Sequence, residues 1–209
     1  MDGVIVDNHE YHFLSWQKLA EKHQIEITEE FYRTQMNGRT FAGIIEVVFK
    51  GAMPLDKAKE IAYEKERIYR ELYKPHLTPT SGLIEFLEEA KQAQVPMAVG
   101  TSAPVENVEF TLDGLAIRNS FKGVVDDRAV TKGKPDPEVY LKCAEMVGVA
   151  PENCIVFEDA VAGIKAGMRA GSKVIALATS HKRNELKADL VVDDFNQVNL
   201  DLIQKVLSS

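Results

Sequence analysis

Residues 154–171 read CIVFEDAVAGIKAGMRAG, and this stretch indicates the fold class. The apolar run CIVF ends in two acids, Glu158 and Asp159, and is followed at once by a run with helical spacing that ends at Gly171. A short continuous apolar run is typical of a strand buried on both faces, and glycine often closes a helix. The stretch therefore predicts a strand–helix unit of a parallel sheet, with two carboxylates at the carboxyl end of the strand.

The same alternation recurs through the second half of the chain. Short apolar runs occur at 96–100, 123–127, 173–179 and 188–194, with helical patterns between them. Strands that alternate with helices in this way build a parallel sheet that is covered on both faces. The short run Val4–Val6 has the same character, and we expect it to belong to a strand.

Residues 9–75 form a block of a different kind. Helical spacing is clear over 9–24 and 55–73, and no strand pattern occurs between them. The sequence therefore predicts an α/β fold. We expect residues 1–8 and 76–209 to form a Rossmann-like parallel core, and residues 9–75 to form an α-helical cap inserted into it.

The overall composition limits the classes of partner. The chain has 209 residues, a formal net charge of −7 and a pI of about 5.3. Such a balance discourages contact with nucleic acid or an anionic membrane, because phosphates attract Lys and Arg. No apolar run approaches the ~20 residues of a transmembrane helix, and the N-terminus lacks the pattern of a signal peptide. We therefore expect a cytoplasmic protein without nucleic-acid or membrane partners.

Polar residues with related chemistry follow four of the predicted strands or flank them. They are Asp2 and Asp7, Thr101 and Ser102, Lys132 and Lys134, and Glu158 and Asp159. Ligands of parallel α/β sheets lie at the carboxyl ends of the strands. Carboxylates are the ligands that Mg²⁺ prefers, while a lysine beside hydroxyl and amide donors suits a phosphate. The pattern thus indicates a site for magnesium and a phosphate group.

These motifs, in this order, resemble those of the haloacid dehalogenase superfamily of aspartate-dependent phosphotransferases. DGVIVDN resembles the second half of its first motif, GTSA its second, KGKPDP its lysine motif and FEDAVAGIKAGMRAG its acidic metal motif. The resemblance extends over essentially the whole chain, and the helical block lies where the family places a small helical cap. The segment DGVIVDNHEYHFLSW is most similar to the β-phosphoglucomutase-like group and its relatives.

The resemblance implies a role for each matching residue. Asp2 matches the general acid and base, which protonates the leaving oxygen and later deprotonates water. Thr101 matches the hydroxyl that binds the phosphoryl group, with the backbone amide of Ser102 beside it, and Lys134 matches the lysine that pairs with its charge. Glu158 and Asp159 match the Mg²⁺ ligands, together with the main-chain carbonyl of Asp2.

The nucleophile of the family is an aspartate two positions before Asp2, and position 1 is Met1. That aspartate belongs to a strand at the centre of the family's sheet. We therefore expect the natural protein to continue upstream of Met1 with this strand. Without it, we expect no phosphoryl transfer through an aspartyl-phosphate.

Three further features concern the cap. His9 and His12 are three residues apart, which is not the spacing of the zinc motif H-E-x-x-H. His12 matches a histidine that, in mutase-like relatives, helps to couple the acid–base aspartate to cap closure; a plain surface or hinge histidine is the alternative. The segment MNGRT at 36–40 matches the place where the family's cap inserts its substrate-specificity loop, which implies that Gly38 allows a tight turn and that Asn37 and Arg39 can reach the leaving group.

The mutase carries a lysine at the position of Asn37 and an arginine near Phe41, and neither is present here. This favours Mg²⁺-dependent hydrolysis of a small phosphomonoester, such as a sugar phosphate, over a phosphomutase. A dehalogenase and a catalytically silent binding protein remain alternatives. The expected partner is a small phosphorylated metabolite, and we expect a monomer or weak dimer.

Overall fold

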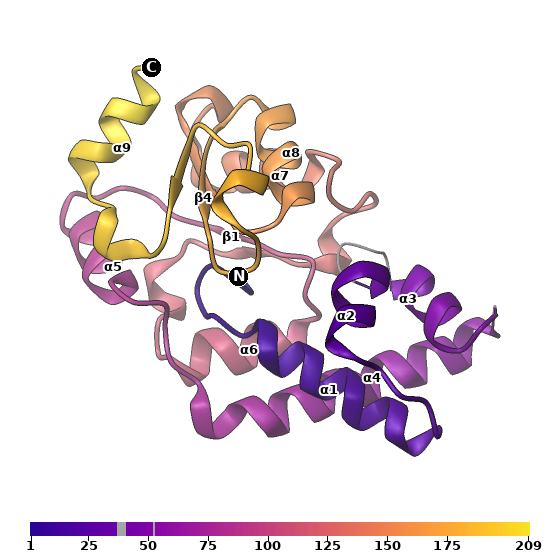
Figure 1. Cartoon of the computed structure of the whole chain (residues 1–209). Helices are drawn as coiled ribbons and strands as arrows, with labels where there is room; N and C mark the ends of the chain where they lie inside the picture. The colour runs from indigo at the N-terminus through magenta and orange to yellow at the C-terminus, as the bar shows by residue number, and fades with distance from the viewer. Residues whose placement is uncertain (37–40, 52) are drawn as a thin grey trace. The chain divides into compact units, whose positions relative to one another are not determined.

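The computed structural model describes residues 1–36, 41–51 and 53–209. The chain divides into two compact units, one formed by Met1–Asp7 with Leu77–Ser209 and the other by Asn8–His76. We call them the core unit and the helical unit and describe each by itself (Figure 1).

The core unit contains five short parallel strands. They are β1 (Val99–Gly100), β2 (Val124–Val125), β3 (Ile155–Glu158), β4 (Lys173–Leu177) and β5 (Leu190–Val192). In the part of the chain that the structure describes, β1 pairs with β2 in one sheet, and the order in the second sheet is β3-β4-β5. These parallel strands, alternating with helices, confirm the predicted α/β fold class.

Five α-helices accompany the strands along the chain, and α7 and α8 pack against them. They are α5 (Leu83–Gln92), α6 (Val105–Gly114), α7 (Glu138–Val147), α8 (Val161–Ala170) and α9 (Leu200–Leu207). Single helical turns lie between them: η3 (Arg118–Ser120), η4 (Asp127–Ala129), η5 (Pro151–Asn153), η6 (Arg183–Glu185) and η7 (Phe195–Gln197). Helices α7 and α8 lie beside one another, and α8 covers β3 and β4 (Figure 1). Helix α8 ends directly before Gly171, whose φ of +90° closes it as the sequence predicted.

The expectation of a strand at Val4–Val6 was wrong. Gly3 adopts a left-handed φ of +66°, and the amides of Val4 and Ile5 both donate to the carbonyl of Met1, at 3.2 and 2.7 Å. This segment is therefore a tight turn, closed by an isolated bridge between Asp2 and Val6. The apolar side chains of the turn are buried, and this burial explains why the sequence has the pattern of a strand.

In the described part of the helical unit, every regular element is a helix. They are α1 (His9–Lys22), α2 (Glu29–Phe31), the π-helical segment η1 (Tyr32–Met36), α3 (Phe41–Val48), α4 (Leu55–Tyr73) and η2 (Lys74–His76). Thr28 accepts the amide of Phe31 and so caps α2. Helix α1 packs along α4, and apolar side chains of both, including Trp16, Leu19 and Ile61, form the unit's core.

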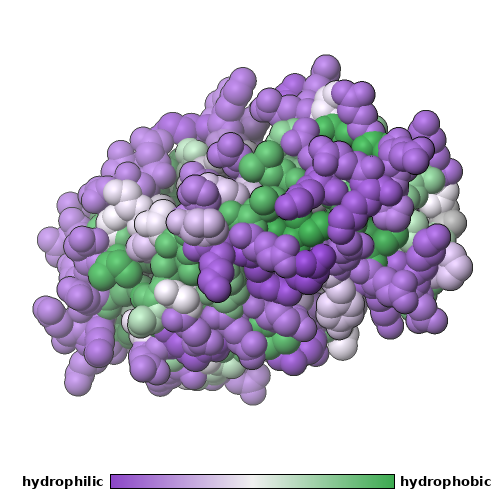
Figure 2. Space-filling model, turned by 90° about the horizontal axis from the view of Figure 1, so that it is seen from below, coloured by the Kyte–Doolittle hydropathy of each residue, from purple (hydrophilic) through white to green (hydrophobic). Residues whose placement is uncertain are grey.

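Among the described residues, no helix is long and apolar enough to cross a membrane. Hydrophilic side chains cover most of the face shown in Figure 2, with apolar side chains gathered in smaller areas between them.

Candidate active site

The strands of the core unit place several polar residues at their carboxyl ends. Strand β1 leads into Thr101, β2 into Asp126, β3 ends in Glu158 followed by Asp159, and β4 leads to Thr179. Because the strands within each sheet are parallel, these residues follow the same end of their strands. This is where the sequence predicted a site.

The turn at the start of the chain lies directly against Asp159. A Cβ atom built on Gly3 would come within 2.2 Å of the Asp159 Oδ2 atom, so only a glycine fits there. The positive φ of Gly3 requires the same residue. The fold thus brings Asp2, which adjoins Gly3, next to the segment that carries Asp159, although the two lie 157 positions apart in the sequence.

Lys134 and Glu158 form a buried ion pair. The Lys134 Nζ atom lies 2.5 Å from Glu158 Oε1, and the two side chains are 15% and 6% exposed. The Tyr140 hydroxyl donates to the same carboxylate oxygen, and the Lys134 ammonium lies 5.0 Å from the centroid of the Tyr140 ring. The amide of Asp159 donates to Glu158 Oε2 at 3.1 Å. Glu158 is therefore already bound on both carboxylate oxygens, and a metal ion would compete with these donors.

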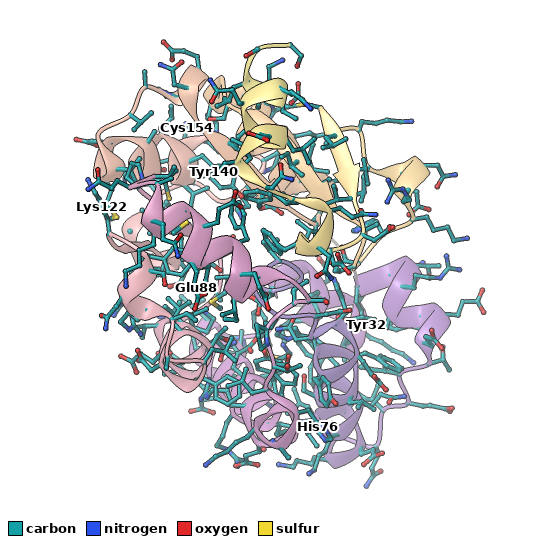
Figure 3. The ribbon with its side chains drawn as sticks, turned by 90° about the vertical axis from the view of Figure 1, so that its left-hand side faces the viewer. Tyr32, His76, Glu88, Lys122, Tyr140 and Cys154 are labelled. Atoms are coloured by element: carbon teal, nitrogen blue, oxygen red, sulfur yellow. The ribbon has the colours of Figure 1, made fainter. Side chains whose placement is uncertain are left out.

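The charges of this cluster follow from its contacts. Burial by itself would raise the pKa of Glu158, but the Lys134 charge, the charge of the N-terminal amino group and the hydrogen bonds from Lys134 and Tyr140 outweigh it and lower that pKa to about 2. Burial, followed by the charge of Glu158, raises the pKa of Tyr140 well above its ordinary value. At neutral pH the cluster therefore consists of an ammonium, a carboxylate and a neutral phenol. Tyr140, labelled in Figure 3, lies in the interior of the core unit.

The two lysines of KGKPDP differ in environment. Lys132 is 73% exposed on its side chain and lies 3.9 Å from the Asp136 carboxylate, so it is the solvated one. The loop is held to α7 by Glu138, which accepts the backbone amides of Thr131 and Lys132 at 2.9 Å. This anchoring leads the chain to Lys134, the lysine that enters the interior.

Thr101 is buried, whereas Ser102 is exposed. The Thr101 amide donates to the Val125 carbonyl at 2.9 Å, and its hydroxyl accepts the Ala103 amide at 3.1 Å. The hydroxyl thus stabilises its own turn and still has a proton to donate. The role of either residue toward a phosphoryl group stays a prediction.

His12 lies in a polar cluster of the helical unit. Its ring stacks on Tyr69 with centroids 4.0 Å apart, and the Lys65 Nζ atom lies 2.6 Å from its Nδ1 atom. Because an ammonium has only donors, Nδ1 is the acceptor in that contact, and the Nε2 atom lies 3.4 Å from the amide nitrogen of Asn8. The Asn8 amide donates to the Tyr69 hydroxyl at 2.6 Å. Asn37, Gly38 and Arg39 lie outside the described residues.

Sequence reasoning missed two of these residues. Lys65 is only 4% exposed, and its position on the apolar face of α4, between Ile61 and Ile68, was the available signal. Tyr140 follows KGKPDP at helical spacing and looked like an ordinary core aromatic residue. A cation or a phenol on an apolar face needs a polar partner when buried, and this rule could have singled out both.

The candidate ligand atoms are carboxylate and carbonyl oxygens, which is the type of ligand that Mg²⁺ prefers. In the part of the chain that the structure describes, no three His, Cys, Asp or Glu side chains lie together as a metal cage. Mg²⁺ commonly uses only one or two carboxylates together with water and substrate phosphate. Asp159 and the main-chain carbonyl of Asp2 fit that requirement, because the Gly3 turn lies against the Asp159 carboxylate.

Comparison with known proteins gives a consistent assignment. Residues 1–177 match the family described as haloacid dehalogenase-like hydrolase. A β-phosphoglucomutase from Bacillus subtilis (strain 168) is 32% identical over 98% of this chain and 92% of its own length. A phosphorylated carbohydrates phosphatase from Thermotoga maritima is 31% identical over 90% of this chain and 86% of its own length.

The fold agrees with a solved structure as well. A haloacid dehalogenase (HAD) hydrolase, family IA, variant 3, from Entamoeba histolytica superimposes with a TM-score of 0.94 at 28% identity, covering 100% of this chain and 97% of that one. These matches show that the chain belongs to the haloacid dehalogenase-like hydrolase family.

Proposed function

We propose that this protein is a Mg²⁺-dependent phosphatase that hydrolyses a small phosphomonoester, such as a sugar phosphate, through an aspartyl-phosphate. The observation that carries the proposal is the close approach of the Gly3 turn to Asp159. It brings an acid–base candidate, Asp2, and a metal-binding candidate, Asp159, to the strand ends where Lys134 also lies. A site of this composition acts on phosphate by positioning and by neutralising charge.

Each residue has a distinct task in this proposal. Asp2 gives a proton to the leaving oxygen and later takes one from the attacking water. Lys134 and Thr101 stabilise negative charge on the phosphoryl oxygens, and Glu158 holds Lys134 in place through the ion pair. Asp159 and the Asp2 carbonyl hold Mg²⁺, which supplies further positive charge when it is bound.

We propose that the attacking group is an aspartate directly before Met1, on a strand between β1 and β3. An apolar cavity of about 500 Å³ in the core unit supports this. It is lined by residues of both strands, among them Val99, Ile155 and Phe157, and by Met1. Within the described residues, β1 pairs only with β2, and β3 pairs only with β4. The other edge of β1 and the other edge of β3 could therefore each pair with an additional strand.

The substrate class is supported by the relatives and by charge. The Thermotoga maritima relative is named as a phosphatase of phosphorylated carbohydrates, and an Escherichia coli relative, 29% identical over 96% of this chain, as hexitol phosphatase A. The net charge of −7 is unfavourable for nucleic acid or an anionic membrane. We therefore propose a small phosphorylated metabolite as the partner of a monomer or weak dimer.

The test uses an extended enzyme, which is this chain preceded by a short apolar strand that ends in aspartate directly before Met1. We expect it to hydrolyse a panel of sugar phosphates with Mg²⁺ and to lose activity in EDTA. The matched control carries asparagine in place of the added aspartate and should be inactive, and so should the unextended chain. Asp2→Asn in the extended enzyme should lower kcat by at least a hundredfold.

Three outcomes would contradict the proposal. Equal activity with aspartate and asparagine at the added position would exclude the aspartyl-phosphate. No activity in an extended enzyme that is folded by circular dichroism and binds phosphate analogues would favour a silent binding protein. Activity that persists in EDTA on a haloacid substrate would favour a dehalogenase.

A phosphomutase is the second candidate, because relatives named β-phosphoglucomutase match almost the whole chain, at 32% identity in sequence and with a TM-score of 0.86 in structure. To decide, the extended enzyme is incubated with β-glucose 1-phosphate and a bisphosphate primer. Release of inorganic phosphate as the main product supports the phosphatase. Conversion to glucose 6-phosphate, without phosphate release, would replace it by the mutase.

A further inference from the structure

The loop after β4 contacts both segments that form the proposed site. It begins with Ala178, whose amide donates to the Val192 carbonyl at 2.9 Å, and it ends at η6. At that end, the Glu185 carboxylate accepts the Lys182 amide at 3.2 Å. The three residues between, Thr179, Ser180 and His181, are therefore held at both ends.

Two hydroxyl groups of this loop bind main-chain carbonyls of the site. The Thr179 Oγ1 atom donates to the Gly3 carbonyl at 2.6 Å, joining residues 176 positions apart. The Ser180 Oγ atom donates to the Asp159 carbonyl at 2.7 Å. Since a serine hydroxyl has one proton, the Nδ1 atom of His181, 2.8 Å from Ser180 Oγ, must be the donor in their contact. His181 thereby orients the serine.

We propose that Thr179 and Ser180 are positioning residues that fix the Asp2 turn and the Asp159 segment relative to one another. The inference rests on the proposed function for its catalytic consequence. Neither hydroxyl contacts a carboxylate of the site, so each acts through the backbone of the residue that it binds.

The close contact at Gly3 makes this placement sensitive. A Cβ atom on Gly3 would lie 2.2 Å from Asp159 Oδ2, so the turn already lies as close to Asp159 as it can. The turn can therefore move only away from Asp159. The Thr179 hydrogen bond opposes that displacement from the side of the Gly3 carbonyl. Misplacement of catalytic groups by about 1 Å can cost on the order of a hundredfold in rate.

The first test is hydrogen exchange on the unextended chain, and it requires no catalysis. Thr179→Val removes the hydroxyl and keeps the shape, and Ser180→Ala does the same for the second bond. We expect amide exchange in residues 1–7 to become about threefold to tenfold faster in Thr179→Val, as for loss of one hydrogen bond. Ser180→Ala should accelerate amide exchange by a similar factor in residues 159–161. Thr179→Ser should restore the wild-type rate.

Ser172→Ala is the matched control. Ser172 precedes β4, and its hydroxyl also donates to a main-chain carbonyl, that of Pro151, at 2.9 Å. The substitution removes the same kind of bond at the other end of the strand. It should leave exchange in residues 1–7 and 159–161 unchanged.

The second test measures kinetics in the extended enzyme. Thr179→Val should lower kcat about tenfold with KM nearly unchanged, because it misplaces Asp2 without removing a substrate contact, and Thr179→Ser should recover kcat. Unchanged exchange in residues 1–7, or faster exchange with an unchanged kcat, would overturn the inference. If the extended enzyme is inactive, the proposed function fails, and exchange alone decides whether the loop fixes the two segments.

Discussion

Replacing Lys134 by methionine tests the buried ion pair of the site. The substitution keeps most of the side-chain volume and removes the charge, so the Glu158 carboxylate remains in an interior where it is only 6% exposed. The Tyr140 hydroxyl and the Asp159 amide still donate to it. However, no hydrogen bond from a neutral group balances a buried charge as an ammonium at 2.5 Å does.

Buried ion pairs in general give the magnitude. After burial, which raises the pKa of Glu158, the Lys134 charge is the largest influence on that pKa, and it lowers it. Breaking a buried pair by removing one partner costs about 3–5 kcal/mol in proteins generally. We therefore expect Lys134→Met to lower the free energy of unfolding by about 3 kcal/mol above pH 5. Because the folded-state pKa is the lower one, this loss should shrink as the pH falls from about 4.5 towards 2.

The assay is urea unfolding followed by far-UV circular dichroism, in EDTA so that no metal contributes. Lys132→Met is the matched control, because Lys132 is 73% exposed and should change stability by less than about 0.5 kcal/mol. The double variant Lys134→Met with Glu158→Gln should recover most of the loss, since it leaves no buried charge. The reasoning is refuted if Lys134→Met costs no more than Lys132→Met, or if the double variant is the least stable of the set.

Two further predictions concern the backbone and pH. Gly3→Ala should lower the free energy of unfolding by about 2 kcal/mol or more, because the new Cβ atom would be strained in the left-handed region and would also collide with Asp159. Gly148→Ala should lower it by only about 1 kcal/mol, because Gly148 has a similar φ of +73° but open space around it. Equal losses in urea unfolding would contradict the close approach of Gly3 to Asp159. Burial and then the charge of Glu66 raise the pKa of Tyr32 to about 12, so stability should fall by about 2 kcal/mol between pH 10 and 12. Tyr32→Phe should lack this fall when both proteins are unfolded with urea across that range.

Much of the fold could be predicted from local pattern. Strand β3, helix α4 over Leu55–Tyr73 and the end of α8 at Gly171 all lie where apolar spacing and a closing glycine placed them. These features depend on neighbours within a few residues, and a sequence displays them directly. The strand-end rule also pointed to Glu158 and Asp159, which the structure places at the carboxyl end of β3.

The same local reasoning failed where burial came without secondary structure. The run Val4–Val6 is as apolar as a strand, yet it is a turn, because Gly3 reverses the chain and the first amides bind the Met1 carbonyl. An apolar pattern indicates that side chains are buried, but it does not indicate which groups the backbone amides and carbonyls of the segment bond to.

The sequence by itself determined the α/β class, the helical block and the residue types of the site, because periodicity and motif spacing are local properties. Only the tertiary structure decided which residues of the chain contact one another. It joined Glu158 to Lys134 and Tyr140, buried Lys65 against His12, and bound Gly3 to Thr179 across 176 positions. Such contacts depend on how whole elements pack, and the free energy of each is set by burial and geometry that no stretch of sequence contains.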